Sequence, residues 1–179
     1  MDKAYGISRR EWMAAGVCAG TLASWCDGGS AGAKMQKLKG EDMANLTPYL
    51  LFEGNCQQAM EFYEGCFGGD LRIMKVKDSP AKEWMAAAQQ DKVINAQLRS
   101  ERIDISASDW LRPDRTPVRG NTVCLYLSGG TLAELKALFE KLSQGAEVTD
   151  PLKEMFFGSY GALNDRFGVR WMFQTNEKA

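Results

Sequence analysis

The sequence of 179 residues contains no histidine. This absence removes the commonest metal-binding side chain and the usual general base at neutral pH. It also excludes catalytic pairs in which histidine activates a serine or cysteine nucleophile. The formal net charge of −1 gives no global basic field for nucleic acid, and no apolar run approaches the ~18–20 residues that span a bilayer. What remains is a composition typical of a globular protein, long enough for one domain with its own core.

The first 33 residues have the features of an export signal. A Ser-Arg-Arg triplet at 8–10 precedes a moderately apolar stretch at 12–25, and an Ala-x-Ala site follows at 31–33. The order of the triplet and the residues after it resembles a twin-arginine signal. We therefore expect a signal peptide at 1–33 and a periplasmic or extracellular mature protein. The alternative is an amphipathic N-terminal helix of a cytoplasmic protein.

Cysteine is too scarce and too badly spaced for a disulfide framework. Cleavage after residue 33 would leave Cys56, Cys66 and Cys124. The first two lie on one predicted helix, about 15 Å apart by helical rise, whereas a disulfide needs Cα atoms within about 7 Å. The spacing does not match a zinc site either. We expect all three to be small buried apolar residues.

A strand–helix–strands pattern occurs twice along the chain. A strand at 46–52 precedes an amphipathic helix at 55–67, and a strand at 122–127 precedes a helix at 131–143. Short segments with strand character follow each helix, at 71–76, 93–99, 103–108, 147–149, 160–163 and 169–175. The order βαβββ, repeated, predicts an α+β fold. We expect a linker at 34–45 and a single domain at 46–175, made of module one (46–110) and module two (120–175).

Local signals predict how several of these elements begin and end. Asn55 with Gln58, and Thr131 with Glu134, have the spacing of a capping box at a helix N-terminus. Pro151 is expected to end the strand at 147–149, because proline removes a ladder hydrogen bond.

Four strings of the sequence match a known family. Together they resemble the PhnB-like branch of the glyoxalase/bleomycin-resistance superfamily, also called vicinal oxygen chelate (VOC) proteins. The strings are LTPYLLFEGN, AMEFYEGCFGG, GNTVCLYL, and Phe157-Gly158 through the Asp165-Arg166-Phe167-Gly168-Val169 segment to Trp171-Met172.

This resemblance implies a fold in which paired βαβββ modules form an incomplete barrel around a cleft. Catalytic members hold a divalent metal there with His, Glu and sometimes Gln, and the metal acts as a Lewis acid. Many relatives are dimers, and some bind a drug without chemistry. The family is often labelled as a demethylubiquinone methyltransferase. Gly129-Gly130 lacks the G-x-G-x-x-G spacing of a nucleotide-binding loop, so we interpret it as a tight turn.

The positions that carry the family's metal ligands differ in this chain. By strand position they fall near Thr47, Ser106, Asn121 and Gln174, and Asn95 replaces a histidine of this branch. Neutral hydroxyls and amides supply neither the charge nor the softness that holds zinc, iron or nickel. We therefore predict no cofactor and no transition metal.

Carboxylates near the predicted strands are a second possible cation site. A converging pair could bind magnesium or calcium. For Asp109, at a strand end, and Asp165, at a turn, we favour solvated positions. The two other carboxylates near the predicted strands are Asp104 and Glu147.

Two further groups of side chains suit a ligand. Phe156 and Tyr160, beside Gly158 and Gly161, are expected to form an adaptable cleft wall, or else a bend packed on the core. The cluster Arg112, Arg115 and Arg119 could attract an anion, but a solvated connection between the modules is the simpler interpretation.

These observations favour an exported protein that binds a small organic molecule between its modules. Walls of apolar side chains would supply affinity, and we predict the ligand-binding residues to be Thr47, Asn95, Ser106, Asn121, Phe156, Tyr160 and Gln174. The alternative is a lyase, isomerase or dioxygenase. A metal-free enzyme would need an acid or base such as Asp109 or Tyr160. A homodimer with only a structural role is a third reading.

Overall fold

The computed structural model describes residues 46–178. The expected signal peptide and the linker at 34–45 lie outside these residues. Module one contains β1 (Tyr49–Phe52), α1 (Cys56–Phe67), β2 (Asp70–Lys75), β3 (Val93–Arg99) and β4 (Asp104–Asp109). Module two contains β5 (Leu125–Ser128), α2 (Leu132–Leu142), β6 (Glu147–Met155), β7 (Gly158–Asn164) and β8 (Arg170–Thr175). Three short 3-10 helices, η1 (Val76–Asp78), η2 (Pro80–Glu83) and η3 (Ala87–Gln89), join β2 to β3.

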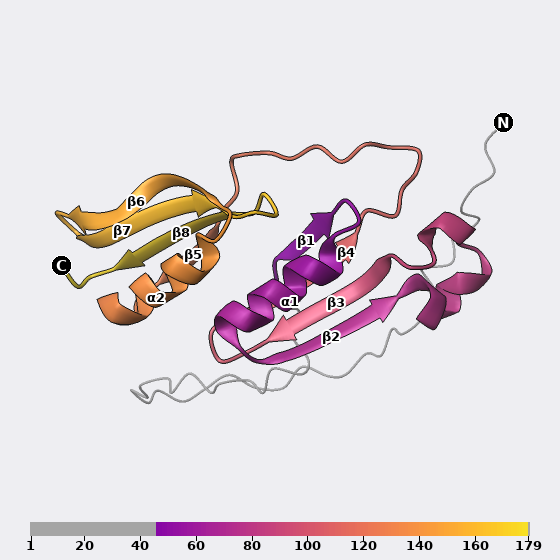
Figure 1. Cartoon of the computed structure of the whole chain (residues 1–179), viewed down its shortest axis with the longest axis horizontal. Coiled ribbons are helices and arrows are strands. Elements are labelled where there is room, and N and C mark those ends of the chain that lie inside the picture. The colour runs from indigo at the N-terminus through magenta and orange to yellow at the C-terminus, as the bar shows by residue number, and fades with distance from the viewer. Residues whose placement is uncertain (1–45, 179) are drawn as a thin grey trace, which may run out of the picture. The chain divides into compact units, whose positions relative to one another are not determined.

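Each module forms one four-stranded sheet. The strand orders are β1-β4-β3-β2 in the first sheet and β5-β8-β7-β6 in the second (Figure 1). β1 pairs with β4 in parallel, and β5 pairs with β8 in parallel. All other strand pairs are antiparallel. The α+β class and the repeated βαβββ order are confirmed. Within the described residues the strands do not close into a barrel.

Most strands lie within two residues of their predicted bounds, but β1 and β5 each begin three residues later than expected, and β6 does not end at Pro151. The proline was expected to end its strand, but β6 continues through it to Met155. β6 is an edge strand, and its register against β7 shifts between Val148 and Asp150 and again between Asp150 and Lys153. Proline is tolerated at such an edge irregularity because no ladder hydrogen bond is lost there.

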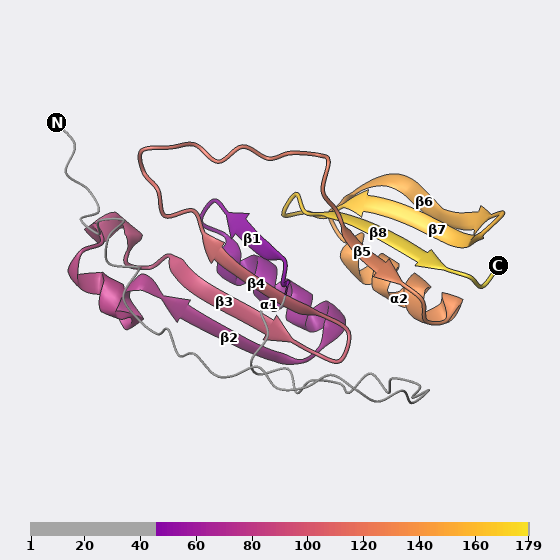
Figure 2. The same cartoon turned by 180° about the vertical axis from the view of Figure 1, so that it is seen from behind.

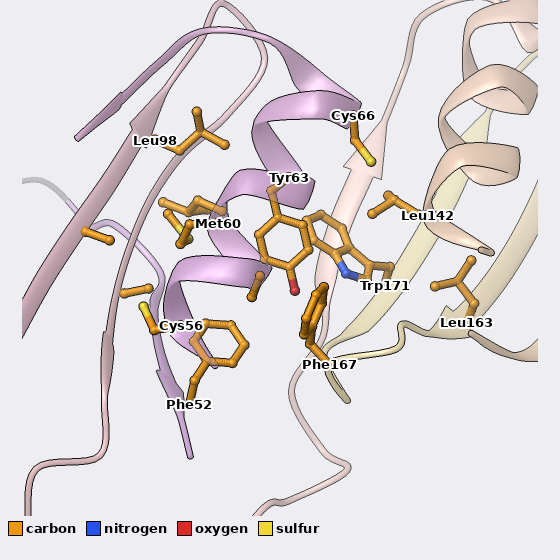
Figure 3. Packing of buried hydrophobic residues seen from close by; sticks show 14 of the residues in the cluster. Phe52, Cys56, Met60, Tyr63, Cys66, Leu98, Leu142, Leu163, Phe167 and Trp171 are labelled. Atoms are coloured by element: carbon orange, nitrogen blue, oxygen red, sulfur yellow. The ribbon is translucent and has the colours of Figure 1, made fainter. Parts of the chain in front are cut away.

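One hydrophobic core serves both modules (Figure 3). The buried face of α1 carries Met60, Tyr63 and Cys66. Tyr63 meets Trp171 of β8 edge to face, with ring centroids 5.6 Å apart. Phe67 stacks on the same indole at 5.5 Å. Aromatic contacts of this kind add to the burial of apolar area, so the helix of module one is a packing partner of the second sheet.

The three cysteines of the described residues are free. Cys56 and Cys66 are buried in this core as predicted, whereas Cys124 is only half-buried, contrary to the expectation that all three are buried. Burial, with a smaller contribution from Asp109, raises the pKa of Cys56 to about 12. Burial also raises the pKa of Cys66. Because the thiolate is the reactive form, both are inert packing residues at neutral pH.

Each sheet has one face toward the core and one open face that carries no helix among the described residues (Figure 2). In the first sheet Leu98, Ile105 and Ala107 point to the core. Their alternating neighbours therefore lie on the open face. In the second sheet Trp171 and Phe173 point to the core, and the open face again carries the residues between them.

The two helices begin differently. Thr131 and Glu134 form the predicted capping box at α2, with Thr131 Oγ1 accepting from the Glu134 N–H at 3.2 Å. The predicted box at α1 is wrong, because the Asn55 side chain makes no capping hydrogen bond. Asp109 of β4 accepts instead from the Cys56 N–H at 3.0 Å. Among the described helices, none is long and apolar enough to cross a membrane.

Candidate functional site

Asp165 is a buried link between the modules rather than a solvated turn residue, which corrects the sequence interpretation. Its side chain is buried, and its Oδ1 accepts from the backbone N–H groups of Phe167 and Val169, each at 2.9 Å. Its Oδ2 accepts from the Tyr63 hydroxyl at 2.6 Å and from the Trp171 indole N–H at 2.9 Å. A buried carboxylate with four donors is fully satisfied, so its role is structural.

Asp109 is also buried, contrary to the solvated position expected for it. Its Oδ1 accepts from the N–H groups of Gly54 and Cys56, both at 3.0 Å. Its Oδ2 accepts from the Val93 N–H at 2.8 Å. These bonds fasten the end of β4 to the start of α1 and of β3. Both oxygens are occupied by backbone donors, which argues against Asp109 as a general base.

Two of the predicted ligand-binding residues share the open face of the first sheet. Ser106 of β4 pairs with Gln97 of β3, and Asn95 lies two residues before Gln97 on the same face. Asn95 is exposed and Ser106 is half-buried. Thr47, also half-buried, precedes β1. This face therefore offers hydroxyl and amide groups.

Two others lie side by side on the open face of the second sheet. Tyr160 of β7 pairs with Gln174 of β8. Tyr126 of β5 donates its hydroxyl hydrogen to Gln174 Oε1, and Lys153 of β6 pairs with Tyr160 on the other side. A polar row thus crosses all four strands. Burial and nearby Asp150 raise the pKa of Tyr160, so its phenol stays protonated and does not serve as a base at neutral pH.

The remaining predicted residues lie elsewhere. Phe156 is 88% exposed at the turn between β6 and β7, where it meets Phe157 edge to face. Gly161 is packed, not adaptable: a Cβ there would lie 2.9 Å from Phe139 Cε2 of α2 and 3.0 Å from Leu152 Cα. The alternative of a strand segment packed on the core therefore holds for Gly161.

A cavity of about 770 Å³ lies where both modules and their connection meet. Module one contributes the end of β1 and Asn55, and module two contributes the start of β5 and the β7–β8 turn. The connecting segment contributes Val118 through Asn121. Of the seven predicted ligand-binding residues, Asn121 alone lines this cavity. The other six lie on sheet faces, before β1 or at a hairpin turn.

The polar side chains on the open faces are poor ligands for the divalent metal that catalytic VOC proteins hold. Asn95, Ser106 and Gln174 offer neutral oxygens, and carboxylate, imidazole or thiolate ligands are needed for zinc or iron. Within residues 46–178, no three His, Cys, Asp or Glu side chains lie close enough to share an ion. The expected absence of a transition metal stays a prediction.

A family model described as 3-demethylubiquinone-9 3-methyltransferase matches residues 44–174. The chain belongs to this family. The solved structure of PA1353 from Pseudomonas aeruginosa is 33% identical, covers 76% of this chain and 100% of its own, and superposes with a TM-score of 0.67. A PhnB protein from Bacillus cereus is 25% identical over 74% of this chain and 99% of its own, with a TM-score of 0.59. The PhnB-like assignment from the sequence strings is confirmed.

The wider fold is that of the glyoxalase/bleomycin-resistance superfamily. A Frankia domain described by that name is 16% identical, covers 73% of this chain and 96% of its own, and has a TM-score of 0.51. The methyltransferase description of the PhnB-like family does not name an activity for this chain. Gly129 and Gly130 have φ of 85° and 69° and turn the chain from β5 into Thr131 at the α2 N-terminus, as the tight-turn interpretation expects.

The strings that identify the family turn out to mark the link between modules. Tyr63, Asp165 and Trp171 all come from those strings, and the Asp165 carboxylate accepts hydrogen bonds from the other two. Figure 3 shows Tyr63 and Trp171 packed against each other in the core. Sequence reasoning missed the cavity residues Asn55 and Arg170. The available signal at Asn55 was its place as a helix N-cap, but the sequence could not show that its side chain makes no capping bond.

Proposed function

We propose that this PhnB-like protein binds a small organic molecule in the cavity between its modules. The observation that carries the proposal is the size and setting of that cavity, about 770 Å³ at the junction of two modules and a connecting segment. Ligand sites of proteins typically occupy ~300–1,000 Å³ and occur at such junctions. The open face of the second sheet, with Tyr126 beside Gln174, adds a polar row for ligands that extend beyond the cavity.

The cavity wall has the composition of a small-molecule site. Leu51, Val118 and Val123 line it, and they are 49%, 93% and 78% exposed. Apolar side chains left open to solvent in a concave site provide affinity when a ligand covers them. Asn121 and Asn164 lie among them and can orient the ligand by hydrogen bonds.

A binding screen tests the proposal. Purified protein is titrated with small carbonyl compounds and aromatic drugs by calorimetry, with and without divalent cations. We expect saturable 1:1 binding that Val118→Trp blocks by filling the cavity. Val148→Trp is the matched control, because Val148 is exposed on β6 outside the cavity. Equal binding by both variants would place the ligand elsewhere. Turnover that requires a metal would favour the alternative, a lyase, isomerase or dioxygenase.

We also propose that two copies associate through the open face of the first sheet. Tyr49 and Met74 are 52% and 47% exposed there. Covering such side chains is favourable by about 25 cal/mol per Å² of apolar surface. Sedimentation velocity of the wild type should show a dimer, and Tyr49→Lys with Met74→Lys should shift it to monomer. A wild-type protein that sediments as a monomer at high concentration would rule out this association.

Export stays a proposal based on residues 1–33. The Ser-Arg-Arg triplet and the Ala-x-Ala site support a cleaved twin-arginine signal. N-terminal sequencing of the protein from its native host should find a start near Lys34. An intact Met1 or Asp2 start would rule the signal out.

A further inference from the structure

The charged side chains around the cavity are predominantly cationic. Arg119, Arg166 and Arg170 line it, against Glu147 and Asp165. Asp165 has all its acceptor positions directed to protein donors, and Glu147 accepts from Asn164 Nδ2 at 3.0 Å. Among the described salt bridges, none includes any of these three arginines. All three guanidinium groups therefore lack a carboxylate partner in this part of the chain.

Arg119 is held in position by the β7–β8 turn. Its Nη1 donates to the Phe167 carbonyl oxygen at 2.7 Å. Its guanidinium also lies against Gly168, which has φ of +80° and where any Cβ would collide with it. This hydrogen bond uses one of the five N–H donors of the guanidinium. The remaining planar fork matches two oxygens of a carboxylate or phosphate.

Arg166 is engaged differently and is not part of this fork. Its guanidinium carbon lies 4.0 Å from the centre of the Phe62 ring and 5.2 Å from that of Phe167. These cation–π contacts use the faces of the two rings. Arg119 and Arg170 are the cavity arginines for which no stacking on an aromatic ring is described, and they are the two we assign to the anion.

Asn55 adds a neutral polar group to the same wall. Its position before α1 is one where asparagine ordinarily caps the helix. Here the Asn55 side chain makes no capping bond, although the neighbouring Cys56 N–H donates to Asp109. Within residues 46–178 its Oδ1 is buried and has no hydrogen-bond partner. A buried acceptor of this kind is normally satisfied, so a ligand with a hydroxyl or amine donor would complete it.

We infer that the cavity takes a small organic oxyanion, a carboxylate or phosphate bound by Arg119 and Arg170, with a donor group reaching Asn55. The inference rests on the proposed function, because it names the ligand class of the same cavity. The apolar part of the ligand would lie against Leu51, Val118 and Val123.

The test compares anionic and neutral probes of one shape. Benzoate and phenyl phosphate are titrated against the full chain by calorimetry, with benzamide as the neutral probe. We expect both anions to bind more tightly than benzamide, and their affinity to fall as salt is added, because salt screens exposed charges. The ratio of benzoate to phenyl phosphate affinity distinguishes a carboxylate site from a phosphate site.

Substitutions locate the anion. Arg119→Gln and Arg170→Gln should each weaken benzoate binding about tenfold or more, since charge-assisted hydrogen bonds are the strong ones. Arg112→Gln is the matched control: it removes the same charge from the same connecting segment outside the cavity. Asn55→Asp places a negative charge in the cavity wall and should weaken benzoate binding more than benzamide binding.

The outcomes separate the two proposals. Benzamide binding as tight as benzoate, with no effect of Arg119→Gln or Arg170→Gln, would overturn the oxyanion inference and leave the small-molecule site intact. Equal losses in Arg112→Gln and Arg119→Gln would also overturn it, because they indicate a general charge effect. If neither these three probes nor any compound of the wider binding screen binds, both the oxyanion inference and the proposed small-molecule site are wrong. Circular dichroism of each variant checks that it is folded.

Discussion

At the scale of single residues, two buried carboxylates hold distant segments of the chain together. Asp109 and Asp165 are each satisfied by donors from segments far apart in the chain. Burying an unpaired carboxylate is strongly unfavourable, so these positions depend on their partners being in place.

Tyr63→Phe should destabilise the protein. The hydroxyl is buried and donates to Asp165 Oδ2 at 2.6 Å. Burial and Asp165 together raise the pKa of Tyr63, so the phenol remains a donor over the accessible pH range. We expect a loss of about 2 kcal/mol in the free energy of unfolding, typical for a hydrogen bond to a charged group. Urea unfolding measures it.

The control for this substitution is Tyr49→Phe, at a tyrosine 52% exposed on β1. It should change the free energy of unfolding by less than about 0.5 kcal/mol. A Tyr63→Phe protein as stable as the control would show that the bond to Asp165 contributes nothing net.

At the scale of elements, a distant carboxylate accepts from the first N–H of each helix, but only α2 also has a local capping box. α2 has a local capping box at Thr131 and Glu134. α1 takes its cap from Asp109, 53 positions away from Cys56 in sequence. The start of α1 is therefore tied to the pairing of β4 in the first sheet, whereas α2 carries its own start signal.

Asp109→Asn should loosen the start of α1. Asparagine keeps one acceptor oxygen but places an amide nitrogen where the other oxygen accepted, so a buried backbone N–H of Cys56 or Val93 loses its partner. We expect a loss of about 2 kcal/mol and faster amide hydrogen exchange in the first turn of α1. Asp104→Asn is the control, since Asp104 is exposed on the same strand. Unchanged exchange in α1 would contradict the long-range cap.

At the scale of the whole molecule, the two modules share one core. Leu98 and Ile105 of the first sheet belong to the same cluster as Leu163 and Phe173 of the second. Trp171 receives contacts from both Tyr63 and Phe67 of α1. Separating the modules would expose this aromatic surface, so neither is expected to be stable alone.

The described domain should therefore unfold in one cooperative transition. Native-state hydrogen exchange should give the same opening free energy for the central strands β3 and β7, because loss of either sheet exposes the shared core. Trp171→Ala should lower both values together, by about 3–5 kcal/mol for loss of a large buried side chain. Two separate opening free energies, with only the second sheet affected by Trp171→Ala, would show independent modules.

The sequence by itself determined the repeated βαβββ order, the buried faces of both helices and the family. Periodicity and local caps report short-range physics, so α2 with Thr131 and the bounds of β3 could be predicted. The family strings identified the fold, and two of their residues, Tyr63 and Asp165, form a hydrogen bond between the modules.

Only the tertiary structure decided which polar groups are buried and which are available. Asp109 and Asp165 have the sequence context of a strand end and a turn, yet donors from distant segments bury them. The Asn55 side chain makes no capping hydrogen bond although it stands at the helix N-cap, and the connecting segment brings Arg119 to the β7–β8 turn. Such contacts depend on packing between elements, and no local pattern records that packing.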